Sequence, residues 1–134
     1  MKAIRFCLIL FFIPCFLCYE GTLSIFKKDN TVEVSAFVGT SSILDYTSGT
    51  WKTVEVEFVG GVIESATSDS NLPTPRLKDT NIIALGDLSG SGQTFPNGKV
   101  ATVTFSEETN MENVNIVFNS PATAIVTSDF TTIT

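Results

Sequence analysis

Apolar and polar residues alternate with a period of two along much of this chain, and this alternation constrains its fold most. In residues 51–58, Val54, Val56 and Phe58 are separated by polar side chains. Such a run predicts a β-strand with one face in the core and one in water. Similar runs recur about every 8 to 12 residues between turns rich in Gly, Pro, Ser and Asn. No window has a helical period, so the sequence predicts an all-β sandwich or barrel of about nine short strands.

The expected strands follow one another along the chain with short connections, and the charged turn at residues 27–30 predicts that the first two form a hairpin. They lie at residues 21–26, 31–38, 51–58, 62–66, 81–87, 99–105 and 113–118, with two more pieces in 122–134. Residues 68–80 contain Pro73 and Pro75 and are expected to form a loop or an edge segment, because proline has no N–H for a central strand. Five phenylalanines are expected to point into the core. These are Phe26, Phe37, Phe58, Phe105 and Phe118.

Residues 81–106 combine an apolar run, a glycine- and serine-rich link and an alternating run. The Asn-Gly pair at 97–98 tolerates positive φ, so the stretch predicts two strands joined as a hairpin. The first of these strands is either covered on both sides or leaves an apolar patch for a partner. Both of its faces are apolar, with Ile82 and Ala84 on one and Ile83 and Leu85 on the other.

The first 20 residues have the build of a secretory signal peptide. Lys2 and Arg5 precede an apolar run over residues 6–19 that contains Pro14. The run is shorter than the roughly 20 residues that span a bilayer, and proline interrupts a spanning helix. We therefore expect residues 1–20 to be a cleaved leader and residues 21–134 to form a single domain that is secreted or displayed on the cell surface.

The leader leaves two questions open. No small-x-small pattern near its end defines the cleavage site. A lipid attached to Cys18 would anchor the protein, although Leu17 stands where a small residue is usual for that modification. A membrane is therefore expected as a partner only through the leader or through such a lipid.

The composition excludes several classes of function. The formal net charge is −6, and if cleavage of the leader falls before Glu20, six basic residues stand against fourteen acidic ones, a balance of −8. Such acidity disfavours nucleic acid and anionic membrane surfaces as partners. There is no histidine, and all three cysteines lie in the expected leader. Histidine triads, histidine metal sites and thiolate chemistry are therefore excluded from the folded part.

Carboxylates are the remaining candidates for acid–base chemistry. Glu55 and Glu57 lie on the same face of one expected strand, roughly 7 Å apart along the backbone, which a two-carboxylate glycosidase could use. A sandwich of this size has little material for a deep cleft, and no other chemical group converges on the pair. The sequence therefore indicates a solvated face and predicts that the protein is not an enzyme.

The glycine-rich residues 86–92 suggest a phosphate or calcium loop. They lack the Lys-Ser/Thr pair of a phosphate-binding loop and a following helix. Asp87, Ser89 and Ser91 alternate as calcium ligands do, but the repeated Asp/Asn and the closing Glu of a calcium loop are missing. We therefore expect a flexible connection and no cofactor, with calcium at Asp87 as the minor alternative.

A strand with a Gly/Asp/Ser-rich bend at residues 82–92 is followed at 98–105 by a strand of the form G-x-hydrophobic-A-T-hydrophobic-T-F. Together with residues 54–58 and 62–64, and with residues 114–118 and 120–129, these segments resemble the cohesin family. Its members are extracellular nine-stranded jelly-roll sandwiches that bind dockerin modules. The resemblance covers about residues 22–134 and implies jelly-roll topology. Phe130 departs from it, because the family often has glycine at this position.

The resemblance implies a non-catalytic module that engages a dockerin-type protein or a polysaccharide through one sheet face. Carried over by strand position, the partner-binding residues would be Thr53, Glu55, Glu57, Ile83, Leu85, Asn113, Asn115 and Val117. A planar aromatic row for glycans is missing, because Trp51, Tyr46 and Tyr19 are the only Trp and Tyr residues. The alternative is a structural or assembly subunit of a cell-surface or appendage structure. It would join its neighbours by strand addition, as the weakly charged ends at 21–26 and 122–134 indicate.

Overall fold

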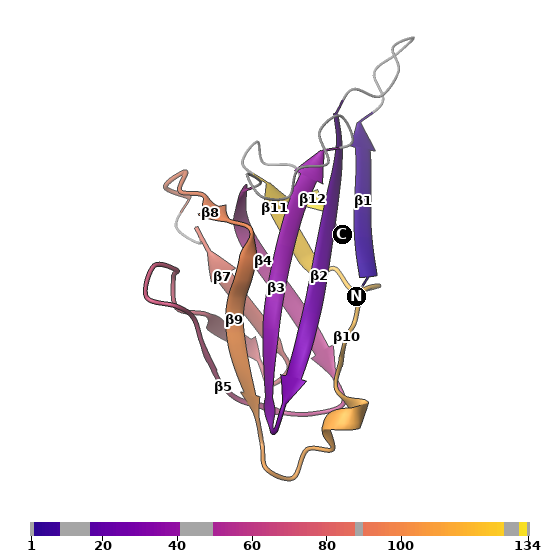
Figure 1. Cartoon of the computed structure of the whole chain (residues 1–134), viewed down its shortest axis with the longest axis vertical. Helices are drawn as coiled ribbons and strands as arrows, with labels where there is room; N and C mark the ends of the chain where they lie inside the picture. The colour runs from indigo at the N-terminus through magenta and orange to yellow at the C-terminus, as the bar shows by residue number, and fades with distance from the viewer. Residues whose placement is uncertain (1, 9–16, 41–49, 88–89, 128–131, 134) are drawn as a thin grey trace.

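Two antiparallel β-sheets face each other in a sandwich (Figure 1). The structure is a computed structural model and describes residues 2–8, 17–40, 50–87, 90–127 and 132–133. Its strands are β1 (Lys2–Leu8), β2 (Leu17–Lys28), β3 (Thr31–Thr40), β4 (Thr50–Val59), β5 (Ile63–Thr67), β6 (Arg76–Asp79), β7 (Ile82–Gly86), β8 (Phe95–Pro96), β9 (Gly98–Phe105), β10 (Asn115–Ile116), β11 (Ala124–Thr127) and β12 (Thr132–Ile133). A single 3-10 turn, η1 (Met111–Asn113), precedes β10 in this described part of the chain.

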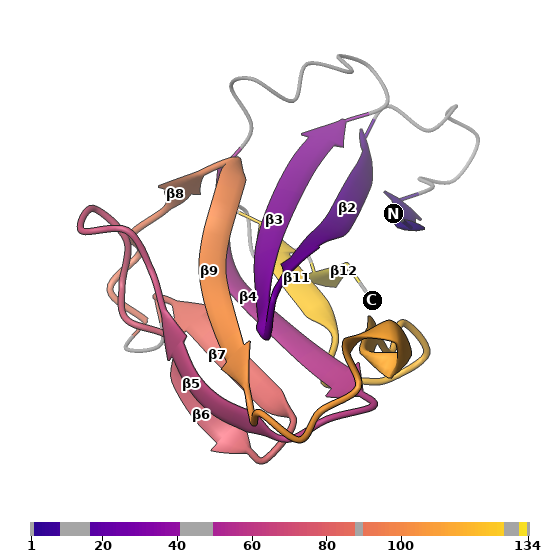
Figure 2. The same cartoon turned by 60° about the horizontal axis from the view of Figure 1, so that its bottom comes forward.

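The first sheet has the strand order β1-β2-β3-β9-β5, and the second has β12-β11-β4-β7-β6, with β8 and β10 also paired to β4. At one edge of the sandwich β5 lies beside β6, and at the other β1 and β2 lie beside β12 (Figure 2). The predicted all-β sandwich is confirmed. The described residues form twelve strands rather than about nine, and the jelly-roll order stays a prediction.

The hairpin expected near the N-terminus is confirmed as β2 and β3. Lys28 pairs with Thr31 across the turn, and the Thr31 hydroxyl donates to the Lys28 carbonyl oxygen at 2.7 Å. Asp29 takes the positive φ of 53° that a two-residue turn requires. The register between β2 and β3 then decides which side chains of both strands face the core.

The core fills the space between the sheets and is largely aromatic and β-branched. Phe58 of the second sheet meets Phe105 of the first edge to face, with ring centroids 5.5 Å apart. Trp51 is fully buried, stacks on Phe95 at 5.1 Å and donates from Nε1 to the Pro96 carbonyl oxygen at 2.9 Å. The ring contact and the hydrogen bond hold the short β8 against the start of β4.

Three of the five phenylalanines lie as predicted, and two do not. Phe58 and Phe105 are buried, and Phe118 is partly exposed while it packs against the core. Phe26 pairs with Glu33 on the outer face of the first sheet and is 63% exposed. Phe37 lies on the same outer face, because its neighbours Ala36 and Val38 take the inward positions of β3.

Residues 81–106 do not form the predicted hairpin. β7 lies in the second sheet between β4 and β6, whereas β9 lies in the first sheet between β3 and β5. The connection therefore crosses from one sheet to the other, with β8 paired to β4 on the way. Alternation and turn residues predict the strands themselves, but they do not say which strand each will pair with.

The Asn97 side chain forms hydrogen bonds with the backbone of β3 and is not part of a hairpin turn between β7 and β9. Its Oδ1 accepts from the Val38 N–H at 2.9 Å, and its Nδ2 donates to the Val38 carbonyl oxygen at 2.9 Å. Val38 is only 4% exposed. The side-chain amide thus satisfies both backbone groups of a buried strand residue.

Substituting Asn97 with alanine is expected to lower the free energy of unfolding by about 2–3 kcal/mol, because two buried backbone groups of Val38 lose their partner. Urea titration followed by the fluorescence of Trp51, the single tryptophan of the chain, measures this change. Asn71→Ala, in an exposed loop, is the control and should stay within about 0.5 kcal/mol of the parent. Equal effects of the two substitutions would contradict a stabilising role for the two Asn97–Val38 hydrogen bonds.

The residues expected to form the leader are not separate from the sheet. β1 pairs antiparallel with β2 from Lys2 opposite Leu23 to Leu8 opposite Leu17. β2 itself begins at Leu17, so the expected boundary at residue 20 falls within a strand. Cleavage of the leader stays a prediction, and it would remove β1 from the edge of the first sheet. No helix in the described ranges is long and apolar enough to cross a membrane.

Candidate binding surfaces

Five of the eight residues predicted for partner binding lie together on the outer face of the second sheet. From residue 53 to residue 58 of β4, partly exposed side chains alternate with buried ones, and the partly exposed ones are Thr53, Glu55 and Glu57. Asn115 pairs with Val59, and the Val117 N–H donates to the Glu57 carbonyl oxygen at 2.8 Å. This register places Asn115 and Val117 on the same side of the sheet as Glu57. We call these five residues the outer face.

Asn113 does not belong to this strand face, although it is close to it in sequence. It ends η1, one residue before the buried Val114, and is exposed. The η1 turn begins after Asn110, whose side chain accepts from the Glu112 N–H. The predicted alternation from residue 113 therefore starts only where β10 begins, at Asn115.

The prediction for Ile83 and Leu85 is wrong: both side chains are fully buried in the core. Leu85 pairs with Val54 and Ile83 pairs with Val56, and residues opposite each other in an antiparallel pair share a face. Because β7 is apolar on both faces, its sequence alone does not show which face is inward. The pairing with β4 decides it.

An ion pair covers the outer side of β7. Lys78 Nζ on β6 lies 2.8 Å from Glu55 Oε1 on β4, and β7 runs between these two strands. Ala84 pairs with Glu55 on this side and is only 3% exposed. Both charged side chains are partly exposed, so the pair contributes at most about 1 kcal/mol to stability. The Glu55 carboxylate is therefore engaged with Lys78. Glu57 is the other glutamate of β4 on the outer face, and its backbone bonds to Val117.

Asp87 anchors the glycine-rich loop and does not have the surroundings of a cation ligand. Its carboxylate accepts from the Ser91 N–H at 2.9 Å, the Ser91 hydroxyl at 2.8 Å and the Gly92 N–H at 2.6 Å. Lys52 Nζ lies 3.6 Å away, and the side chains of Lys52 and Asp87 are 5% and 1% exposed. Donors and a cation surround these oxygens, which is how a buried carboxylate is satisfied. Ser89, the third residue of the predicted calcium pattern, lies outside the described residues.

A hollow of about 490 Å³ with a mixed polar and apolar lining lies beside this loop. Two loops form it, and its lining residues are Ser70, Asn71, Leu72, Pro73, Thr74, Gly86, Asp87, Ser91, Gln93 and Phe95. Phe95 is buried against Trp51, so its ring is not a free stacking platform. The sequence carries no signal for this hollow, because the pairing of β6 with β7 brings the loop before β6 beside the loop after β7.

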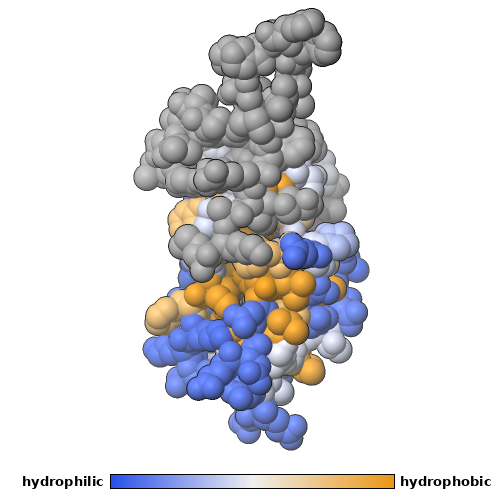
Figure 3. Space-filling model, turned by 90° about the vertical axis from the view of Figure 1, so that its right-hand side faces the viewer, coloured by the Kyte–Doolittle hydropathy of each residue, from blue (hydrophilic) through white to orange (hydrophobic). Residues whose placement is uncertain are grey.

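A second site, absent from the sequence prediction, lies between the sheets at the edge of β2. Leu23 and Ile25 from β2, Asn115 and Ile116 from β10, and Phe118 line a hollow of about 100 Å³. We call these five residues the edge cleft. Figure 3 shows apolar residues gathered on this side of the molecule, with hydrophilic ones around them. The residues come from segments about 90 positions apart, so no local pattern predicts the cleft.

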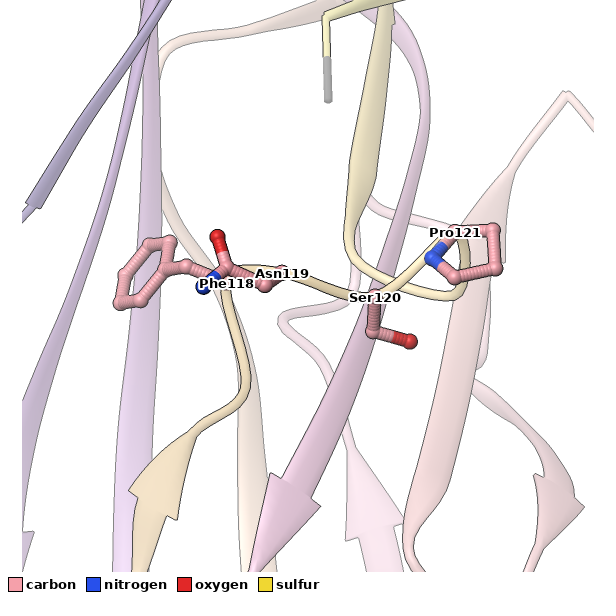
Figure 4. A pocket seen from close by; sticks show the side chains of 4 residues that line it. All are labelled: Phe118, Asn119, Ser120 and Pro121. Carbon is pink, nitrogen blue, oxygen red and sulfur yellow. The ribbon is translucent and has the colours of Figure 1, made fainter.

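The edge cleft adjoins a further hollow of about 400 Å³ lined by Phe118, Asn119, Ser120 and Pro121. The Phe118 side chain points away from Ser120 and Pro121 (Figure 4), and it contributes to both hollows. At the other end of the cleft, Lys27 Nζ donates to the Met111 carbonyl oxygen at 2.8 Å. This bond ties the η1 turn to β2.

Comparisons with protein-family models, curated proteins and solved structures found no match. The resemblance to cohesins therefore remains a prediction from the sequence.

Proposed function

We propose that the protein is a secreted, non-catalytic binding module of the cohesin-like type that engages a dockerin-type protein module through the outer face. The observation that supports this best is the junction of β4 with residues 115–117, which brings Glu57, Asn115 and Val117 together. The outer face as a whole combines hydroxyl, carboxylate, amide and aliphatic groups. Such a mixed surface suits a protein partner.

A protein partner is preferred to a polysaccharide because of the side chains on this face. Flat sugar-binding surfaces stack aromatic rings against the sugar, and the outer face consists of Thr, Glu, Asn and Val. Trp51, which lies on the same strand, points into the core and is fully buried. Glu57 offers a carboxylate for a basic group of the partner.

Substituting Glu57 with lysine is expected to weaken binding to a retained dockerin module about tenfold or more, through lost attraction and new repulsion. The test first passes purified protein over a panel of immobilised dockerin modules and insoluble polysaccharides, and then measures Kd by calorimetry. Glu64→Lys, an exposed glutamate on β5 of the other sheet, is the matched control with the same charge change.

Three results would count against the proposal. Folded protein that no dockerin module retains would refute the partner, and retention on polysaccharides alone would refute a protein partner. Equal weakening by Glu57→Lys and Glu64→Lys would refute the outer face. Intact mass of protein recovered from the culture medium tests secretion separately, and a mass that includes residues 1–20 would refute cleavage of the leader.

A further inference from the structure

The edge of β2 is paired along only part of its length. β1 runs antiparallel to β2 and begins at Lys2, which lies opposite Leu23. On the other side β3 continues to pair with β2 as far as Lys28. Within the described ranges, no strand pairs with residues 24–28 on the β1 side. In an antiparallel sheet every second residue of such an edge points its N–H and C=O outward.

The edge cleft lies directly beside this open segment. Leu23 and Ile25 face inward and form its wall on β2, while Ile116 and Phe118 form the wall opposite. Ile25 and Phe118 are partly exposed although both pack against the core. If a strand were added beside β2, its inward apolar side chains would lie between the sheets at the edge cleft. They would cover the exposed parts of Ile25 and Phe118.

The outer side of the same segment carries one exposed aromatic ring and ends in a positive charge. Phe26 is 63% exposed, the largest exposed fraction among the exposed large apolar residues of the described chain. Lys28, the last residue of β2, is exposed. An added strand would therefore meet an apolar wall inside, an aromatic ring outside and a cation at the end of β2.

We propose that residues 24–28 and the edge cleft form a strand-acceptor site for an extended peptide segment of another protein. The peptide lies in line with β1 and antiparallel to β2. It carries apolar side chains at alternate positions and a carboxylate near its N-terminus, which lies beside Lys28. β1 itself shows that this edge accepts an antiparallel strand. The site shares Asn115 with the outer face, but residues 24–28 and the other four residues of the edge cleft lie outside that face. The proposal does not depend on the proposed function.

A labelled seven-residue peptide, Asp-Asp-Val-Thr-Val-Thr-Val, is the probe. Full-length protein is titrated with it by fluorescence anisotropy, and backbone amide shifts are recorded by NMR. A dissociation constant in the micromolar range is expected, with the largest shifts at residues 24–28. A peptide with proline at its central position should bind at least tenfold more weakly, because proline removes a main-chain donor and fits poorly in a strand. This control alters only the probe and leaves the protein unchanged.

Ile25→Ser tests the cleft in the protein, and Ile82→Ser, a partly buried isoleucine of the second sheet, is the matched control. Ile25→Ser should weaken peptide binding at least fivefold, and Ile82→Ser should leave it unchanged. Equal binding of the two peptides, or shifts confined to Thr53, Glu55, Glu57 and Val117, would overturn the proposal. Sedimentation equilibrium tests the other occupant: a dimer whose formation perturbs residues 24–28 would show that a second copy of this chain fills the site, and would overturn a peptide from another protein.

Discussion

Replacing Asp87 with alanine is expected to lower the free energy of unfolding by about 3–5 kcal/mol. The substitution leaves the Lys52 ammonium buried without the carboxylate that lies 3.6 Å from it. It also removes the acceptor for the Ser91 and Gly92 N–H groups, which hold the glycine-rich loop. Urea titration followed by the fluorescence of Trp51 measures the loss.

Asp69→Ala, in an exposed loop, is the control and should change stability by less than about 0.5 kcal/mol. Lys52→Met combined with Asp87→Ala should recover part of the loss, because the double variant no longer buries the Lys52 charge beside the site of the missing carboxylate. A loss below about 1 kcal/mol for Asp87→Ala, or no recovery in the double variant, would contradict this role of the ion pair.

Gly86→Ala is the second substitution with a large expected effect, a loss of about 4 kcal/mol or more. Gly86 has a φ of +119°, where a side chain strains the backbone, and its added Cβ would collide with the Lys52 carbonyl oxygen. That oxygen accepts from the Asp87 N–H at 2.8 Å, so relieving the collision would break a bond of the same loop. Urea titration and an amide NMR spectrum show whether the fold survives.

Gly92→Ala separates steric collision from backbone strain. Gly92 also has a positive φ, +90°, but a Cβ added there would meet no atom within 4 Å. Its substitution should therefore cost only the strain of about 1–2 kcal/mol. If Gly86→Ala cost no more than Gly92→Ala, the close approach of β4 to β7 at this point would be refuted.

The strands were predictable where one face of each is polar. Val54, Val56 and Phe58 alternate with polar residues, and β4 follows with the expected face inward. The β2–β3 hairpin was predictable because a charged two-residue turn joins two alternating runs. Local patterns suffice in these cases, since period and turn chemistry point to the same answer.

The candidate sites were predictable only in part, for a related reason. Thr53, Glu55 and Glu57 share a face because alternation along one strand is local. Val117 joins them through a backbone bond to Glu57, which requires pairing between segments about 60 residues apart. The edge cleft forms because β2 and β10 lie in opposite sheets. No pattern within either segment predicts that the two will be neighbours.

The sequence by itself determined that this chain folds as a β-sandwich, because period-two alternation between turns stabilises strands and no segment supports an amphipathic helix. Only the tertiary structure decided the partners of each strand. β7 and β9 went to different sheets, Ile83 and Leu85 turned inward, and Phe26 turned outward. The physical reason is that pairing register is a property of two segments at once: a shift of one residue exchanges the buried and exposed faces of a strand.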